Sequence, residues 1–382
     1  MKRLNGTHIG SVPAAPARRT RARLDPSHDD LTLITGGAGF VGSNLAHRLM
    51  SDGRPVLVLD NLSRAGVERN LTWLRDTHGA LLQTMVEDIR DAAAVSRAVA
   101  RARRVFHFAA QVAVTTSLVD PREDFAINAG GTLNVLEAAR ASAARPSILM
   151  TSTNKVYGGL EDVGLELRGQ RYTPVSTDIA EHGISEAHAL DFHSPYGCSK
   201  GTADQYVRDY ARSFGLRTIV FRMSCIYGWR QFGTEDQGWV AHFLIRALEG
   251  KPITLYGDGH QVRDILYVGD AVSAYLGAWR AIDRIKGQVF NLGGGPDNAV
   301  SLHLLLDHIS ATLGNRVQVE TSDWRPGDQR WFVADTRAID AALDLPRKLD
   351  WRTGVARLAD WLAEQRGFNL PAGAPLASAG AR

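Results

Sequence analysis

The fold is decided by the stretch Leu31-Thr32-Leu33-Ile34-Thr35-Gly36-Gly37-Ala38-Gly39-Phe40-Val41-Gly42. An apolar run typical of a buried strand leads into a glycine-rich turn, and a helical pattern of apolar residues follows it. Gly36 permits a tight turn, Gly39 lets the backbone approach a pyrophosphate, and Gly42 allows close helix packing. Because the helix N-terminus offers its amides to phosphate, the order strand, glycine turn, helix predicts a dinucleotide site.

The next predicted strand, at 55–59, ends at Asp60, about 20 residues beyond the glycines. A carboxylate in this place accepts the hydroxyls of an adenosine ribose and repels a 2′-phosphate. NAD is therefore favoured over NADP. The alternative is a structural glycine turn followed by a chance aspartate, which would leave the chain without a cofactor.

Predicted strands and helices alternate along the rest of the chain. Strands are expected at 81–85, 104–110, 147–150, 217–221, 253–255 and 290–292, and helices at 121–144, 195–214, 239–248 and 302–313. This alternation predicts an α/β fold: a doubly wound parallel sheet of extended Rossmann type, with a smaller C-terminal α/β substrate domain and ligands at the carboxyl ends of the strands. The expected cofactor-binding residues are Gly36, Gly39, Phe40, Val41, Gly42, Asp60, Asn61, Asp88, Ile89, Ala109, Ala110, Asn128, Tyr196 and Lys200.

The domain boundaries follow from shifts in composition. Residues 1–30 are rich in arginine and poor in apolar periodicity, which predicts a disordered basic tail, although an organelle transit peptide or an anion-binding arm would look similar. An NAD-binding domain is expected at 31–222, with an irregular substrate-loop insertion at 159–194. Residues 223–366 are expected to form mainly the substrate-binding domain, with part returning to the sheet, and 367–382 a flexible tail.

Composition narrows the class of protein. The 382 residues carry a net charge of +3, and four arginines cluster at 18–23, so the folded body is close to neutral and a nucleic-acid partner is not expected. The sequence has no apolar run long enough to span a bilayer. Two cysteines, Cys198 and Cys225, provide no disulfide framework, which fits a reducing compartment, and we expect a cytoplasmic protein.

A candidate catalytic pair lies in the stretch 191–201. Pro195 suits the first turn of a helix, so Tyr196 and Lys200 fall one turn apart on the same face. An ammonium beside a phenol favours the phenolate, so the sequence predicts that the pKa of Tyr196 falls toward working pH and that the tyrosine takes a hydroxyl proton. Thr153, at the end of a predicted strand, is expected to join this pair.

The insertion 159–194 contains acids and histidines of the kind that bind metals. Their spacing is irregular, and solvated polar loop residues explain them better than ligands do. No metal is predicted. A segment at 222–238, rich in glycine, glutamine, arginine and aromatic residues, is instead expected to be a substrate loop.

Together, the glycine turn, Asp60, Asp88, Thr153 and the Tyr196-x-x-x-Lys200 pair resemble the extended short-chain dehydrogenase/reductases that act on nucleotide sugars, over about 31–366. The resemblance implies that Thr153, Tyr196 and Lys200 act as one catalytic unit and that Lys200 also holds the nicotinamide ribose. It further implies that two arginines in the second half of the chain, Arg263 and Arg325, grip the diphosphate. Arginine suits that task because its planar fork binds phosphate oxygens in pairs.

Finer segments resemble the CDP-tyvelose (CDP-paratose) 2-epimerases. They are 152–158, 190–201, 230–232, 236–240 and 328–330. Nucleotide-sugar 4,6-dehydratases place Asp-Glu directly after the catalytic threonine, where this chain has Asn154 and Lys155, so elimination is disfavoured, and so is the related decarboxylation. The substrate-binding residues implied are Asn154, Lys155, His193, Arg222, Gln231, Arg263, Arg325 and Asp328.

The expected reaction is inversion at C2 of a CDP-hexose of the paratose type, through a transient 2-keto sugar with NAD bound throughout. The carbon and the nucleotide follow from the resemblance only. Alternatives are a 4-epimerase of the UDP-glucose or UDP-uronate type, another nucleotide-sugar oxidoreductase that releases NADH, and a non-catalytic nucleotide sensor. The resemblance also implies a homodimer or homotetramer built through the helices at 121–144 and 195–214.

Overall fold

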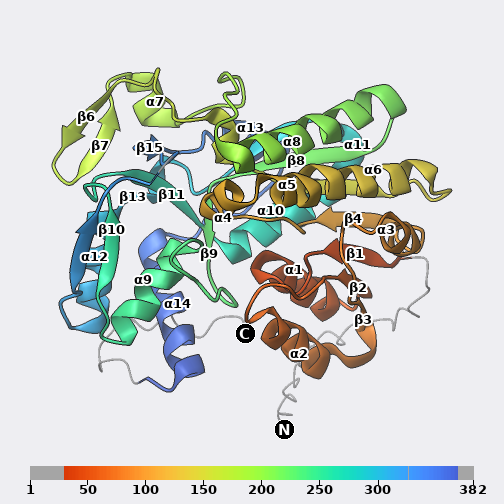
Figure 1. Cartoon of the computed structure of the whole chain (residues 1–382), viewed down its shortest axis with the longest axis horizontal. Helices are drawn as coiled ribbons and strands as arrows, with labels where there is room; N and C mark the ends of the chain where they lie inside the picture. Colours follow the sequence, from red (N-terminus) through yellow and green to blue (C-terminus); the bar gives the residue numbers. More distant parts are fainter. Residues whose placement is uncertain (1–29, 326, 369–382) are drawn as a thin grey trace, which may run out of the picture.

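The computed structural model describes residues 30–325 and 327–368 (Figure 1). The predicted tail at 1–30 therefore lies outside the described residues except for its last position, and so does 369–382 of the C-terminal tail. Within the described part of the chain, no helix has the length and apolar character needed to cross a membrane.

The described residues form a central parallel sheet of seven strands in the order β12-β8-β5-β4-β1-β2-β3. These strands are β1 (Thr32–Thr35), β2 (Val56–Leu59), β3 (Leu82–Met85), β4 (Arg104–His107), β5 (Ser147–Thr153), β8 (Thr218–Met223) and β12 (Val289–Leu292). The strand β12 comes from the second half of the chain and pairs with β8. The predicted doubly wound α/β fold is confirmed.

Helices cover both faces of this sheet (Figure 1). Alternation along β1 sends Leu33 to a core shared with α3, α6 and α8, while Ile34 faces a core shared with α1 and α10. The helices are α1 (Phe40–Ser51), α2 (Val67–His78), α3 (Ala92–Val99), α4 (Val114–Val119), α5 (Pro121–Phe125), α6 (Gly131–Ala141), α7 (Thr177–His182), α8 (Ser194–Phe214), α9 (Trp239–Leu248), α10 (Val268–Arg280), α11 (Ile282–Ile285), α12 (Leu302–Leu313), α13 (Arg337–Ala342) and α14 (Trp351–Arg366).

The order of the strands reverses at β1. Its neighbours are β2 on one side and β4 on the other, and both pair with it in parallel. Doubly wound sheets open a crevice at such a switch point, beyond the carboxyl ends of the strands. The glycine turn that follows β1 lies there, and Thr153 ends β5 at the same edge of the sheet.

The helix predicted at 121–144 is divided. It consists of α5, a π-helical turn at Ala126–Gly130, and α6, which ends at Ala141. The π-helical turn contains Asn128, whose carbonyl accepts the hydroxyl of Thr132 at 2.6 Å. A wider turn of this kind changes which residues face the sheet, and such turns are common at functional sites.

The insertion 159–194 is not irregular throughout, so that expectation was wrong. It contains an antiparallel hairpin of β6 (Leu165–Arg168) and β7 (Arg171–Pro174), followed by α7. Most side chains of β6 are exposed, so the hairpin lacks the apolar alternation by which a half-buried strand is detected.

A smaller region built from the second half of the chain packs beside the central sheet (Figure 1). Its strands are β9 (Cys225–Tyr227), β10 (Ile253–Tyr256), β11 (Val262–Tyr267), β13 (Ala299–Ser301), β14 (Val319–Ser322) and β15 (Trp331–Phe332). The strand β11 pairs with β9, β13 and β15, while β10 pairs with β14. The predicted 222–238 loop is thus shorter than expected, because 222–223 complete β8 and β9 follows.

Candidate active site

A cavity of about 400 Å³ lies between the carboxyl edge of the sheet and the smaller region. It brings together most of the residues predicted for catalysis and substrate binding. Those lining it are Thr153, Asn154, Lys155, Tyr196, Gln231, Arg263, Arg325 and Asp328, and Phe40 and Val41 of the predicted cofactor set line it as well. Lys200, His193 and Arg222 are not among the lining residues.

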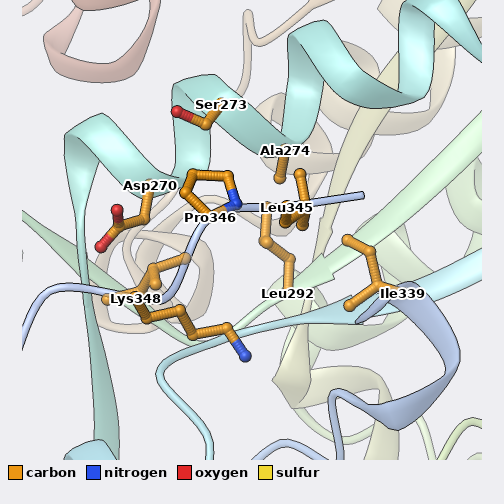
Figure 2. Close-up of a pocket in the computed structure, with 9 residues that line it drawn as sticks. Asp270, Ser273, Ala274, Leu292, Ile339, Leu345, Pro346 and Lys348 are labelled. Carbon is orange, nitrogen blue, oxygen red and sulfur yellow. The ribbon is translucent and has the colours of Figure 1, made fainter. Parts of the chain in front are cut away.

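A second hollow, shown in Figure 2, is unsuited to chemistry. Its volume is about 10 Å³, enough for one water molecule, and its walls are mainly apolar, with Leu292, Ile339 and Leu345 among them. The ammonium of Lys348 at its rim is bound to the hydroxyl of Thr336 at 2.7 Å. The large cavity is therefore the candidate active site.

The glycine turn after β1 fits a dinucleotide. Gly36 has a φ of +68°, and a Cβ on it would lie 2.6 Å from the amide nitrogen of Ala109. A Cβ on Gly42 would lie 2.3 Å from the carbonyl oxygen of Gly36, so only glycine lets α1 start this close to β1. The helix α1 has neither a capping side chain at Gly39 nor an acid in its first turn, which leaves its first amides open to a phosphate.

Asp60, at the end of β2, is tied to the same turn. One carboxylate oxygen accepts the amide of Ala38 at 3.0 Å and the other accepts the amide of Leu62 at 2.9 Å. Burial raises the pKa of this carboxyl, although these backbone hydrogen bonds oppose the rise. Asn61 donates to Asp88 at 2.9 Å, and the Arg90 guanidinium holds the pKa of Asp88 well below its usual range.

The remaining residues of the predicted cofactor set lie around the crevice at the ends of β3 and β4. Ala109 follows β4 and donates its amide to the hydroxyl of Thr35 at 3.3 Å. Ile89 is buried against α6, where a Cβ on Gly131 would lie 2.7 Å from its side chain. Ala110 comes next to Ala109, so the small side chains do lie at a carboxyl end of the sheet.

Asn128 does not present a free polar group toward the crevice. Its oxygen accepts the amide of Gln111 at 3.0 Å, and its nitrogen donates to Asp124 at 3.1 Å and to Ser199 at 3.0 Å. The side chain is 1% exposed. We therefore correct its predicted role: it positions the loop after β4 and the helix α8 from behind the site.

The predicted catalytic residues Thr153 and Tyr196 lie where β5 meets α8. The hydroxyl of Thr153 hydrogen bonds to the phenol of Tyr196, and both side chains line the cavity. Burial raises the pKa of Tyr196 to about 12, and Asp124 adds to the rise. The expectation that this pKa falls is therefore wrong for the cofactor-free protein, because desolvation of the phenolate outweighs the hydrogen bond from Thr153.

Lys200 lies one turn beyond Tyr196 on α8 and is 5% exposed. Its ammonium donates to the carbonyl oxygen of Thr151 in β5 at 2.6 Å. Burial lowers its pKa to about 8, although Asp204 and Asp124 oppose the decrease. The lysine is therefore held against the sheet as a buried cation, one helical turn from Tyr196.

Arg222 was predicted to bind substrate, and this prediction was wrong. Its side chain is 2% exposed and forms a two-pronged ion pair with Asp204 of α8, at 2.9 and 3.1 Å. A third bond runs from its guanidinium to the phenol oxygen of Tyr157 at 3.1 Å. The hydrogen bonds to Asp204 and Tyr157 occupy the guanidinium inside the core, where it links β8 to α8.

Asn154 and Lys155, directly after Thr153, face the smaller region. Asn154 donates to the side-chain oxygen of Gln329 at 2.9 Å. The ammonium of Lys155 donates to the carbonyl of Gly327 at 3.0 Å and lies 3.7 Å from a carboxylate oxygen of Asp328. Burial lowers the pKa of Lys155 to about 8, with the charge of Arg263 as a second cause.

The two predicted phosphate-binding arginines both reach the cavity and are paired with carboxylates. Arg263 on β11 donates to Asp328 at 2.6 Å. Arg325 lies 3.8 Å above the ring of Tyr256, donates to the carbonyl of Glu235 at 3.1 Å, and has the Glu235 carboxylate 3.5 Å away. A diphosphate in the cavity would compete with these carboxylates for the same guanidinium groups.

His193 precedes α8 and lies outside the cavity wall. Its ring contacts the loop at Gly327, where an added Cβ would lie 3.2 Å from the ring. The predicted substrate contact therefore has no support from the cavity lining. Across 30–325 and 327–368, no group of three or more histidine, cysteine, aspartate or glutamate side chains is arranged to hold a metal ion.

The predicted substrate loop is anchored to α1 and α2. Asn44 of α1 donates to the carbonyl of Trp229 at 2.9 Å, and Asn70 of α2 donates to the carbonyl of Arg230 at 3.3 Å. The guanidinium of Arg230 stacks on Trp73 at 3.7 Å. These contacts hold the loop at the mouth of the cavity, so that Gln231 faces inward.

Sequence reasoning missed several polar residues of the cavity. Thr115, Ser152, Gln231, Gln237 and Gln261 line it, and each has a buried side-chain oxygen without a hydrogen-bond partner among the residues that the structure describes. Of these, only Gln231 was predicted to bind substrate. Ser152 and Gln237 lie inside 152–158 and 236–240, two of the segments that carry the family resemblance, and that signal could have identified them.

The family profile described as "NAD dependent epimerase/dehydratase family" matches residues 32–293. The chain belongs to this family, and it is an NAD-dependent enzyme; the predicted family, enzyme class and cofactor are confirmed. Among known proteins, the CDP-paratose 2-epimerase of Salmonella typhi is 45% identical over 336 residues, which cover 86% of this chain and 98% of that protein.

Solved structures agree with this assignment. The UDP-glucose 4-epimerase of Thermotoga maritima, solved with UDP-glucose, superposes with a TM-score of 0.74 at 28% identity, covering 88% of this chain and 99% of that chain. The UDP-glucose 4-epimerase of Thermus thermophilus, solved with NAD, superposes with a TM-score of 0.72 at 30% identity, covering 87% and 98%.

Proposed function

We propose that the protein inverts C2 of a CDP-linked hexose of the paratose type, through a transient 2-keto sugar. The observation that carries the proposal is the pairing of Tyr196 with Thr153 in a cavity where Asn154 and Lys155 come next and Arg263 stands beyond them. The similarity to the CDP-paratose 2-epimerase of Salmonella typhi supports the choice of carbon and nucleotide.

Proton transfer is carried out by Tyr196 of α8, assisted by Thr153 of β5 and Lys200 of α8. Bound NAD supplies the hydride acceptor and donor, and its positive charge favours the phenolate. Tyr196 takes the proton of the sugar hydroxyl while Thr153 hydrogen bonds to the phenol. The buried ammonium of Lys200 provides a positive charge one turn away. Tyr196 returns the proton when the carbonyl is reduced from its other face.

Binding energy is expected to be concentrated on the diphosphate. Arg263 and Arg325 both line the cavity, and each gives up a carboxylate partner to a phosphate. A hexose that is held mainly through its diphosphate can turn over within a cavity of about 400 Å³. Net inversion then needs no outside reductant, since the hydride that is removed is the one returned.

Elimination of water is disfavoured by the residues beside Thr153. A dehydratase needs an acid and a base at this point, and the chain supplies an amide and an ammonium, Asn154 and Lys155. The nearby carboxylate of Asp328 lies 3.7 Å from the ammonium of Lys155, an ion pair that does not depend on Arg263. A 4-epimerase remains the second candidate, because solved 4-epimerases share the fold over 87% or more of the chain.

The first test is the variant Tyr196→Phe. The phenyl ring preserves the packing at a buried position but removes the acid-base group, so we expect turnover to fall by at least about a thousandfold while the fold is kept. Full activity of the variant would contradict the proposal.

The second test locates the carbon. With substrate deuterated at C2, we expect NMR to show a C2-inverted product that keeps the label, because hydride leaves and returns within one site. Label lost to solvent would indicate proton abstraction beside a ketone instead. Label retained together with inversion at C4 would favour the 4-epimerase.

We also propose a dimer formed through α5 and α8. Apolar side chains are exposed along this face, including Leu118, Val119, Phe125 and Tyr206, of which Val119 is 85% exposed. The helices that carry these side chains, α4, α5 and α8, pack against one another. Covering a patch of this kind is a common reason for association.

A further inference from the structure

We propose that Asp124 is a positioning residue for the proton transfer: its buried carboxylate balances the charge of the Lys200 ammonium and so sets the pH range in which Tyr196 works. This role rests on the proposed function, in which those two residues of α8 act on the sugar hydroxyl. Asp124 lies on α5 and does not line the cavity. It therefore acts through its neighbours and not on the substrate.

The carboxylate of Asp124 is buried and bonded on both oxygens. The residue is 1% exposed. One oxygen accepts the side-chain amide of Asn128 at 3.1 Å, and the other accepts the hydroxyl of Ser199. The oxygen of Asn128 already accepts the backbone amide of Gln111, so its nitrogen is the group that donates to Asp124. Neither donor is charged, so the two bonds fix the carboxylate without neutralising it.

The bond to Ser199 places this negative charge beside the Tyr196–Lys200 turn. Ser199 lies between those two residues in α8, and its hydroxyl is 3.2 Å from the carbonyl oxygen of Tyr196. The helices α5 and α8 pack against each other. Burial is the largest influence on both pKa values, lowering that of Lys200 and raising that of Tyr196, and the charge of Asp124 raises both.

The other ionisable groups around Lys200 are paired or neutral. Asp204 of α8 also raises the pKa of Lys200, but Arg222 of β8 binds both of its carboxylate oxygens. His107 of β4 is neutral, because burial lowers its pKa to about 3 and the charge of Lys200 lowers it further. Of the two carboxylates that act on Lys200, Asp124 is thus the one bonded to uncharged donors in the described part of the chain.

A negative charge in this position favours the protonated form of both residues of the turn. Its removal should lower the pKa of Tyr196 and that of Lys200 together. In the pH profile of kcat/KM, the acid limb reports protonation of Tyr196 and the alkaline limb reports deprotonation of Lys200. Both limbs should therefore move to lower pH, whereas a loss of packing would lower activity and leave both limbs in place.

The first test compares pH profiles of kcat/KM for CDP-paratose between the unmodified holoenzyme and Asp124→Asn, which removes the charge at nearly constant shape. We expect both limbs to move to lower pH by at least about half a unit. Asp120→Asn is the matched control, because it makes the same change at the exposed N-cap of α5, where asparagine also caps. Limbs that stay in place in Asp124→Asn, or an equal movement in the control, would overturn the inference.

A second test follows the Asp124–Lys200 pair without substrate, by urea unfolding of the full-length, cofactor-free chain. The factor by which Lys200→Met lowers the unfolding constant at about pH 7 should be at least about threefold larger in the Asp124→Asn background. Additive effects of the two substitutions would refute the pairing.

The same pair of substitutions decides the matter if Asp124→Asn alone fails to fold. The double variant Asp124→Asn/Lys200→Met should then fold, since it lacks the unbalanced ammonium. A double variant that also fails to fold would contradict the role of Asp124. Because unfolding involves no turnover, an error in the proposed sugar or carbon leaves this test unaffected, and its failure leaves the proposed reaction standing.

Discussion

The buried ammonium of Lys200 is expected to lower the free energy of unfolding of the cofactor-free protein. Burial lowers its pKa from 10.5 to about 8. Each pKa unit corresponds to about 1.4 kcal/mol, so the charged lysine costs the cofactor-free protein about 3 kcal/mol. Lys200→Met removes the charge at similar volume and loses the hydrogen bond to the Thr151 carbonyl, worth about 1 kcal/mol. The net expectation is a gain of about 2 kcal/mol at pH 7, together with loss of epimerase activity.

The pH dependence follows from the sign of the shift. The folded-state pKa lies below the unfolded value, so the unfolded chain binds the proton more tightly between pH 8 and 10.5. The destabilisation is fully present below pH 8 and disappears as the pH rises to 10.5. The advantage of Lys200→Met should therefore shrink over this interval.

Urea unfolding of the cofactor-free protein at about pH 7 and about pH 10 measures the effect, with the free energy of unfolding compared between Lys200→Met and the unmodified chain. Lys251→Met is a suitable control, because the side chain of Lys251 is 55% exposed and its removal should change stability by less than about 0.5 kcal/mol. A Lys200→Met protein that is less stable at neutral pH, or an advantage that is the same at both pH values, would refute the reasoning.

Three further predictions concern other parts of the molecule. Arg222→Met leaves the carboxylate of Asp204 buried and unpaired, so it should destabilise the protein by about 3–5 kcal/mol in urea unfolding; an unchanged stability with a raised KM would instead restore the substrate role. Gly42→Ala places a Cβ 2.3 Å from the Gly36 carbonyl and should reduce the NAD that remains bound after gel filtration, whereas full NAD content would contradict the close packing. Phe125→Asp puts a charge on the exposed α5 face and should yield monomers by light scattering; an unmodified protein that is already monomeric would exclude the dimer.

Local sequence determined much of the framework. The strands that alternate with helices specified a parallel sheet, because buried parallel strands appear in the sequence as short apolar runs. The glycine turn was recognisable because a left-handed or crowded turn requires glycine. The same local patterns placed Thr153 at a strand end and Tyr196 and Lys200 on one helical turn. The hairpin β6–β7 escaped detection, since its exposed strands bury no alternating apolar face.

Only the tertiary structure decided what each polar residue does. Arg222 and Asn128 look like ligand-binding residues in the sequence. In the structure, Asp204 on α8 bonds to the guanidinium of Arg222, and the amide of Gln111 in the loop after β4 bonds to the side-chain oxygen of Asn128. Conversely, Gln261 drew no attention as a single residue until folding buried its oxygen without a partner in the described chain. The pKa of Tyr196 rises rather than falls for the same reason: desolvation depends on everything packed around a group, which a stretch of sequence does not contain.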